Sequence, residues 1–121
     1  LKALAKLLSD NPNITIELAA HTDMVGNNTA NQELSLKRAQ SVVTYLVSMG
    51  IEKDRLTAVG YGEEKPVVVT DALHKQYPFL PKNQVLDEAF ILTLPETQQE
   101  ICNSLNRRTE FRVLKTTYNL Y

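Results

Sequence analysis

Residues 14–39 read ITIELAAHTDMVGNNTANQELSLKRA, and this stretch determines which fold the chain can adopt. Residues 14–20 alternate apolar and polar side chains, which predicts a strand with its isoleucines and leucine on the buried face. Residues 21–30 are polar and contain a glycine, as is typical of a loop. Over residues 31–49 apolar side chains recur at helical spacing, which predicts an amphipathic helix. Gly50 follows where a left-handed helix cap belongs.

The segments on either side of this stretch complete a layered domain. Leucines at helical spacing predict a first helix that ends at the polar segment 10–13. A second strand is predicted over 56–61, and a last strand over 109–115 with Phe111 and Val113 facing inward. Helices that alternate with strands cover a sheet. We therefore predict an α/β (α+β) two-layer sandwich, in which two main helices lie on one face of a small mixed β-sheet.

The segment from residue 67 to residue 105 is less regular and is interrupted by prolines. A short helix is predicted over 87–92, and Pro95 suits the first turn of another helix that ends near residue 105. We interpret 67–105, the insertion segment, as a helical insertion within one domain that covers residues 1–115. Residues 116–121 are interpreted as a C-terminal tail.

Composition and charge argue against several classes of function. The chain has 121 residues, of which 43% are hydrophobic and 22% charged, as is ordinary for a soluble globular domain. A net charge of −1 argues against nucleic acid, because phosphate binding needs a clustered positive surface. No apolar run reaches the roughly 20 residues that span a bilayer. The sequence starts at Leu1 without an initiator methionine, which we interpret as a fragment of a longer protein.

Metal-binding and redox chemistry find little support. Cys102 is the single cysteine, so it builds no disulfide and no zinc site by itself, and we expect a small buried hydrophobe. His21 and Asp23 lack a third ligand at a suitable spacing, and His74 is isolated. No metal site and no cofactor are therefore expected.

Catalytic constellations are equally weak. Glu63 and Glu64 are adjacent on a predicted turn, where their side chains point apart, so they do not form a carboxylate pair for glycan cleavage. Ser35 has no histidine near it in sequence and is interpreted as helix surface. Residues 60–62 read Gly-Tyr-Gly, which is too short for a phosphate loop and favours a bend or bulge. We expect no enzyme activity and no catalytic residue.

An acid and a base flank the predicted loop. Asp23 follows the first strand, and Arg38 lies in the first turns of the next helix, so the two can face each other across a cleft. A carboxylate and a guanidinium together suit a zwitterionic ligand, because the acid takes an ammonium and the arginine grips a carboxylate bidentately. Free backbone N–H groups at the helix start add attraction for that carboxylate. A helix cap at Asp23 and a solvated Arg38 are the structural alternatives.

The same residues carry a resemblance to a known family. His21-Thr22-Asp23-x-x-Gly26, followed by Asn31-x-x-Leu34-Ser35-x-x-Arg38-Ala39-x-x-Val42, resembles the signature of OmpA-like C-terminal domains. That family includes the peptidoglycan-associated lipoprotein and the wall-anchoring domain of the flagellar stator. The resemblance continues in order through Gly50-Ile51, Arg55-Leu56, Gly60-Tyr61-Gly62-Glu63-x-x-Pro66 and Asn106-Arg107-Arg108-x-Glu110-Phe111.

The resemblance implies a ligand and a set of residues that bind it. Such domains bind the stem peptide of peptidoglycan non-covalently, through the zwitterionic side-chain end of meso-diaminopimelate. Carried over by position, Asp23 takes the ammonium and Arg38 the carboxylate. The remaining lining positions are Thr22 and Asn31 for hydrogen bonds, Leu34 for an apolar wall, and Arg108 at the rim.

The implied role is to hold the outer membrane, or a complex in it, to the cell wall from the periplasm of a Gram-negative cell. Any membrane association would come from another part of the parent protein. Two alternatives stay open: a protein–protein interaction module with a vestigial wall site, and an accessory domain of a peptidoglycan hydrolase. The sequence leaves the oligomeric state, the parent protein and the amidation of the ligand open.

Two features depart from the family pattern. The family begins with a strand that carries an aromatic-Asp pair, and this chain starts inside the following helix, so that strand is absent from it. The insertion segment is longer than expected and is similar to versions in Bacteroidetes-type proteins. The role of the insertion stays open.

Overall fold

The computed structural model describes residues 1–118, and the tail residues 119–121 lie outside the described part. Its helices are α1 (Lys2–Asp10), α2 (Asn28–Ser48), α3 (Asp71–Gln76), α4 (Glu88–Ile91) and α5 (Glu96–Asn106), with a 3-10 turn η1 at Lys53–Arg55. The strands are β1 (Thr15–His21), β2 (Leu56–Gly62) and β3 (Arg108–Lys115). Among these residues, no helix is sufficiently long and apolar to cross a membrane.

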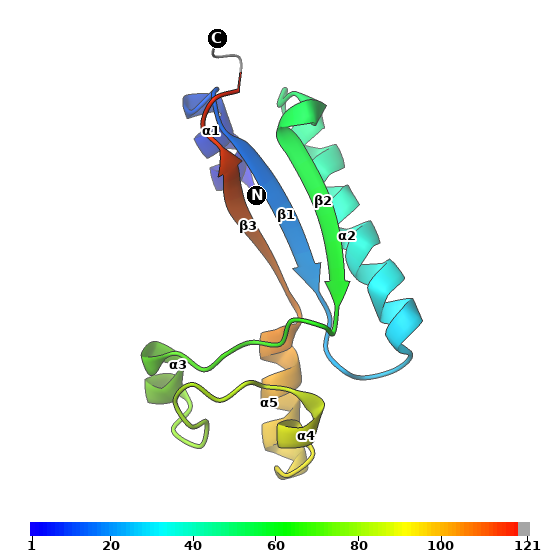
Figure 1. Cartoon of the computed structure of the whole chain (residues 1–121), viewed down its shortest axis with the longest axis vertical. Helices are drawn as coiled ribbons and strands as arrows, with labels where there is room; N and C mark the ends of the chain where they lie inside the picture. The colour runs from blue at the N-terminus through cyan, green and yellow to red at the C-terminus, as the bar shows by residue number, and fades with distance from the viewer. Residues whose placement is uncertain (119–121) are drawn as a thin grey trace.

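The predicted two-layer α/β sandwich is confirmed. The described strands form one sheet in the order β2-β1-β3, with β1 parallel to β2 and antiparallel to β3. Helices α1 and α2 lie on one face of this mixed sheet, and α3, α4 and α5 gather beyond the end of the sheet at which β1 and β2 finish (Figure 1). The other face of the sheet carries no helix in this view.

Two separate apolar cores hold the molecule together. The first lies between the sheet and its helices and contains Leu8 of α1, Leu46 of α2, and Ile16 and Leu18 of β1. The second lies within the insertion segment, and its buried residues are Val69, Leu80, Leu86, Ile91 and Cys102. Removing this apolar surface from water is the main stabilising term in each core. The insertion segment therefore has its own packed interior.

Cys102 is fully buried in the second core, as the sequence indicated. Burial raises the pKa of its thiol, because a buried site disfavours the charged thiolate. Cys102 therefore behaves as a small hydrophobe in the core.

Helix α2 ends as its sequence predicts and begins earlier than predicted. The Gly50 backbone has φ +96°, its N–H donates to Val47 O, and the next N–H, of Ile51, donates to Leu46 O. This pair of bonds closes the helix with a left-handed cap. The start at Asn28 precedes the predicted residue 31 because the Asn27 side chain accepts a hydrogen bond from Ala30 N and caps the first turn.

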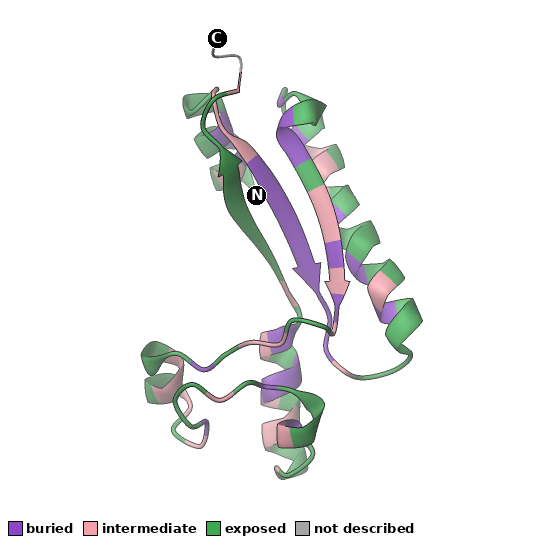
Figure 2. Cartoon of the chain, in the orientation of Figure 1, coloured by how far each residue is buried: buried purple, intermediate pink, exposed green. Residues whose placement is uncertain are grey.

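Phe111 and Val113 face the predicted side of the sheet, but the prediction that they are buried was wrong. Register partners Leu18 and Ile16 put both side chains on the helix-facing side of the sheet, yet each is 48% exposed. Among the described residues β3 pairs with β1 alone, so it forms an edge of the sheet. Figure 2 shows the contrast: β1 is buried along most of its length, while β3 is exposed.

Ser35 was predicted to lie on the helix surface, and this prediction was wrong. The residue lies in the interior. Its side chain is fully buried, its hydroxyl donates to Gln32 O at 2.9 Å, and the same oxygen accepts from Gly62 N at 2.9 Å. Gly60 lies so close to α2 that a Cβ there would approach Leu36 N to 2.3 Å. Helix α2 thus packs directly on the backbone of β2.

Candidate functional site

The loop between β1 and α2 carries Asp23 in a fixed position. The Asp23 carboxylate is largely buried, and its Oδ1 accepts a hydrogen bond from Val25 N at 2.9 Å. A bond from an aspartate to the backbone two residues ahead is a common way to fix a turn. Asp23 is therefore held by its own loop instead of capping α2, a role that Asn27 performs.

Thr22 and Asn31, both predicted in the site, hold the same loop. Thr22 N donates to Gly62 O at 2.9 Å, and the Thr22 hydroxyl donates to Asp23 O at 3.1 Å. The Asn31 amide donates to Val25 O at 3.0 Å and to Asp23 O at 3.4 Å. The structure thus brings Asp23, Thr22 and Asn31 together and ties the loop to both β2 and α2.

Arg107 is the residue that meets Asp23 in the structure, and sequence reasoning missed it. Its Nη1 donates to Asp23 Oδ2 at 2.5 Å and its Nη2 donates to Glu100 Oε1 at 2.7 Å. Hydrogen bonds to Glu100 and then to Asp23 raise the pKa of the Arg107 guanidinium. The sequence signal for this contact was the pair of adjacent arginines, Arg107 and Arg108. The family resemblance pointed to Arg108, whereas Arg107 makes the contact.

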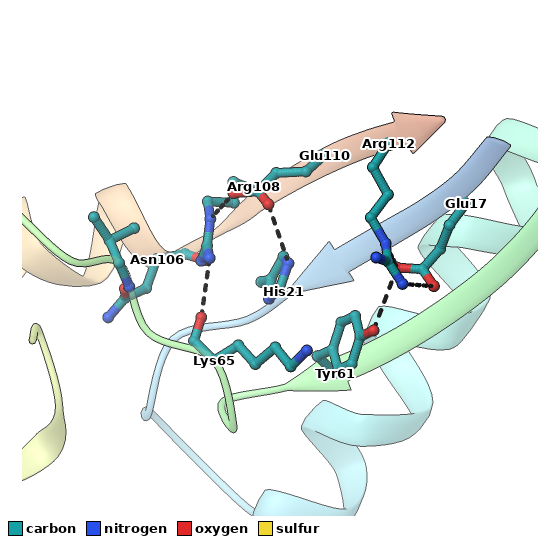
Figure 3. Close-up of polar contacts among 9 residues, drawn as sticks. Glu17, His21, Tyr61, Lys65, Asn106, Arg108, Glu110 and Arg112 are labelled. Atoms are coloured by element: carbon teal, nitrogen blue, oxygen red, sulfur yellow. Dashed lines mark hydrogen bonds and ion pairs between the residues drawn. The ribbon is translucent and has the colours of Figure 1, made fainter. Parts of the chain in front are cut away.

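Arg108 makes its contacts elsewhere. Its Nε donates to Glu110 Oε1 at 2.6 Å, its Nη2 to Lys65 O at 2.9 Å and its Nη1 to Asn106 O at 3.2 Å (Figure 3). These bonds join β3 to the segment that follows β2. No hydrogen bond or ion pair within residues 1–118 joins Arg108 to the Asp23 loop.

Arg38 and Leu34 lie exposed on α2. Asn31, Leu34 and Arg38 follow one another at spacings of three and four, so they share one side of the helix. Leu34 is 41% exposed, and Arg38 is exposed, with no hydrogen bond or ion pair between its guanidinium and residues 1–118. The rise from Asn31 to Arg38 is about 10 Å along the helix axis. The structure shows no direct hydrogen bond or ion pair between Asp23 and Arg38 among the described residues.

The insertion segment packs beside the Asp23 loop. Met24 packs against the second core. The Asn106 amide accepts from Val67 N at 2.9 Å and donates to Leu86 O at 3.0 Å, which holds both ends of the segment together. A hollow of about 190 Å³ lies between the loop and the segment, lined by Thr22, Met24, Glu63, Pro66, Leu86, Asp87, Glu88 and Asn106. The insertion segment is therefore a wall of the candidate site.

Curated relatives match about half of the chain. Outer membrane porin F of Pseudomonas fluorescens is 45% identical over 67 residues, which is 55% of this chain and 21% of the relative. Outer membrane protein A of Salmonella typhi is 44% identical over 71 residues, covering 54% of this chain and 20% of the relative. The chain thus spans about a fifth of the length of these relatives.

Solved structures match nearly the whole chain. The peptidoglycan-associated lipoprotein of Burkholderia pseudomallei superimposes with a TM-score of 0.63 and 25% identity, over 93% of this chain and 73% of that one. A MotB-like protein of Desulfovibrio vulgaris has a TM-score of 0.59 at 23% identity, over 99% of this chain and 60% of that one, which shows a shared fold.

The model of the OmpA family matches residues 1–77, which include α1, β1, the Asp23 loop, α2 and β2. This match covers more than half of the chain. The protein therefore belongs to the OmpA family, as its motifs predicted.

Proposed function

We propose that this domain binds peptidoglycan non-covalently and anchors the outer membrane, or a complex in it, to the cell wall. The observation that carries the proposal is a largely buried carboxylate, Asp23, fixed on a loop beside a helix that presents the exposed guanidinium of Arg38. Family membership and the structural likeness to a peptidoglycan-associated lipoprotein support the same function. The proposed place of action is the periplasm.

The ligand is the zwitterionic end of meso-diaminopimelate in the stem peptide. Its ammonium binds Asp23, and its carboxylate binds Arg38 through parallel hydrogen bonds. Leu34 offers an exposed apolar contact to the ligand on the same side of α2 as Arg38. Thr22 and Asn31 keep the loop in shape, since their hydrogen bonds are already used within it.

Arg107 supports this ligand without competing for it. A carboxylate has roughly four lone-pair positions. Val25 N and Arg107 Nη1 each use one position of Asp23, so positions for an ammonium remain. Arg107 also holds the Asp23 carboxylate in place through its hydrogen bond to Oδ2. We therefore assign Arg107 a positioning role in the site, in addition to the residues that the sequence indicated.

The binding energy suits reversible anchoring. Each charge-assisted hydrogen bond contributes roughly 1.5–3 kcal/mol net, so a few of them give micromolar to millimolar binding to one stem peptide. Many copies on one sacculus then hold by avidity. The proposed non-covalent binding requires no covalent step and no cofactor.

Co-sedimentation with purified sacculi tests the proposal. Asp23→Asn and Arg38→Ala should each weaken binding at least tenfold, because each removes one charge-assisted contact. Arg107→Met should weaken binding by a smaller factor. Lys37→Ala, the neighbouring exposed position on α2, is the matched control and should bind like the parent.

Three outcomes would contradict the proposal. If Asp23→Asn and Arg38→Ala stay folded and still sediment like the parent, the site is wrong. Release of soluble muropeptides by the parent would favour the hydrolase alternative. Loss of sacculus binding only when the surface of the insertion segment is changed would favour a protein-interaction module with a vestigial wall site.

A further inference from the structure

The sheet face opposite α1 and α2 contains a polar hollow of about 240 Å³. Its lining comes from all three strands and the turn after β2: Glu17, Ala19, His21, Tyr61, Lys65, Glu110, Phe111 and Arg112. Ala19 forms the floor, because its small side chain lies between the longer side chains of Glu17 and His21 on the same face of β1. This volume is slightly below that of sites for drug-sized molecules, so it fits one small chemical unit.

Part of this lining is already paired. Glu17 accepts from Arg112 Nε at 3.2 Å and from the Tyr61 hydroxyl at 3.3 Å (Figure 3). One oxygen of Glu110 accepts from Arg108 Nε at 2.6 Å. These bonds hold the two carboxylates charged and lower their pKa values, chiefly through Arg112 for Glu17 and Arg108 for Glu110.

Three groups in the hollow have hydrogen-bonding capacity that the described residues do not use. His21 is 3% exposed, yet neither ring nitrogen has a hydrogen-bond partner. The second oxygen of Glu110 lies 3.9 Å from His21 Nε2, beyond hydrogen-bond distance. The Lys65 ammonium lies over the Tyr61 ring, 4.0 Å from its centroid, and makes no ion pair with residues 1–118. His21 is buried, whereas Glu110 and Lys65 are exposed. A buried polar group without a partner costs free energy, so a ligand that supplies a partner for His21 is favoured.

The hydrogen-bonding groups of His21, Glu110 and Lys65 indicate which kind of ligand fits the hollow. Lys65 donates and Glu110 accepts. Burial, then Arg108 and Lys65, lower the pKa of His21 against the opposing effect of Glu110, so its neutral ring offers one donor and one acceptor. A bare carboxylate would meet Glu17 and Glu110, and a bare cation would meet Lys65 and Arg112. The hollow therefore suits a neutral unit with both donors and acceptors, such as adjacent hydroxyl and amide groups.

We propose that this hollow binds an N-acetylated sugar unit of the glycan strand of peptidoglycan. The inference rests on the proposed function, because it adds a second contact with the same polymer. The two sites lie close together along the chain: His21 ends β1, and Asp23 follows two residues later, which is at most about 7 Å of extended chain. One domain can thus contact a stem peptide and the strand that carries it.

A nuclear magnetic resonance titration with a peptide-free N-acetylglucosamine tetramer tests this proposal. In the parent chain we expect signals of Ala19, His21 and Lys65 to shift together, with affinity in about the millimolar range. Ala19→Leu fills the floor and leaves every polar side chain in place, so it should weaken binding more than tenfold. Lys65→Ala should weaken it several-fold.

Thr57→Leu is the matched control for Ala19→Leu. Thr57 is the register partner of Glu17, so it lies on the same sheet face, and it is exposed and outside the hollow. This variant should bind the tetramer like the parent. Comparable unfolding curves for the two leucine variants would confirm that both stay folded.

Separate probes keep the two proposals apart. Free meso-diaminopimelate reports on the Asp23 site, and Asp23→Asn should abolish its binding while sugar binding persists. If the parent binds diaminopimelate but the tetramer shifts no signal in the hollow, the sugar site is overturned and the proposed function stands. Sugar shifts that persist in Ala19→Leu would place the sugar elsewhere and overturn the inference too. Acetate that shifts the same signals more strongly than the sugar would show an anion site instead.

Discussion

At the scale of single residues, Arg55 is the buried charge that joins the two ends of the first α/β unit. It is 2% exposed, its Nε donates to Ile14 O at 3.0 Å, and its Nη2 donates to Leu8 O and Asn11 O at 2.8 Å each. A planar guanidinium with several donors can satisfy these carbonyl groups at once, which a lysine ammonium cannot do in the same geometry. Arg55 therefore fixes the exit of α1 against the entry to β1.

Replacement of Arg55 should destabilise the domain strongly. Arg55→Met leaves buried carbonyl groups without donors, so we expect a loss of about 3 kcal/mol in the free energy of unfolding. Urea denaturation measures this loss. Lys53→Met, an exposed neighbour in the same 3-10 turn, should change the midpoint little. Equal midpoints for the two variants would mean that the carbonyl groups find other partners.

His21 should make stability depend on pH. Its folded-state pKa lies below the ordinary value of about 6.5, chiefly because the ring is buried and secondly because of Arg108. The unfolded chain then binds a proton more readily, so stability falls as pH drops below about 6.5, by at most about 1.4 kcal/mol per pH unit for one group. His21→Asn should flatten the change in unfolding free energy between pH 7.5 and 5.5. This window lies above the ordinary carboxylate range, so an unchanged slope in the variant would assign the effect to another group.

The sequence predicted contacts between nearby residues of the site but missed a contact between distant ones. The Asp23 loop and its partners Thr22 and Asn31 could be predicted, because they lie within a few positions of one another. The contact between Asp23 and Arg107 joins positions that are 84 residues apart. Two adjacent arginines look alike in a sequence, and only the path of α5 into β3 decides which of them reaches the loop.

At the scale of helices and strands, the sequence predicted those features that depend on residues close together in the chain. The alternation of β1 and the left-handed cap of α2 depend on neighbouring residues, and both were predicted. Helix α3 was missed because Asp71–Gln76 is too short to show a helical period, and it begins where the Thr70 hydroxyl accepts from Leu73 N at 3.2 Å. The exposure of β3 follows from its place at the sheet edge, which residue alternation does not reveal.

The close contact between α2 and β2 gives a sharp prediction. A Cβ at Gly60 would meet backbone and side-chain atoms of α2, including Leu36 N at 2.3 Å and Ser35 Oγ at 2.7 Å. Gly60→Ala should therefore push the helix from the strand and lower the free energy of unfolding by about 1–3 kcal/mol. Thermal or urea denaturation measures the loss. Thr57→Ala, an exposed position on the opposite face of the same strand, is the control, and a Gly60→Ala variant as stable as this control would show that α2 can move away at little cost.

At the scale of the whole molecule, the two cores make the insertion segment a packing partner of the Asp23 loop. Met24 lies in that loop and packs against the second core, while Arg107 links Asp23 to Glu100 of α5. Both links join the candidate site to elements outside the sheet (Figure 1). The packing of the insertion segment should therefore influence ligand binding even though most of its residues lie away from Asp23.

Ile91→Ala tests this coupling. Ile91 is fully buried in the second core, so the variant loses apolar packing and leaves a cavity, which typically costs about 2–5 kcal/mol. Because local unfolding follows cooperative units, backbone amides of residues 67–105 should exchange hydrogen faster while those of β1 and α2 stay protected. Sacculus binding should fall several-fold, since the Asp23 loop loses its support at Met24.

Leu8→Ala, a fully buried leucine in the first core, should instead speed exchange in the sheet. Uniform acceleration across the chain in both variants would show that the two cores unfold as one unit and that the insertion segment has no separate influence on the site.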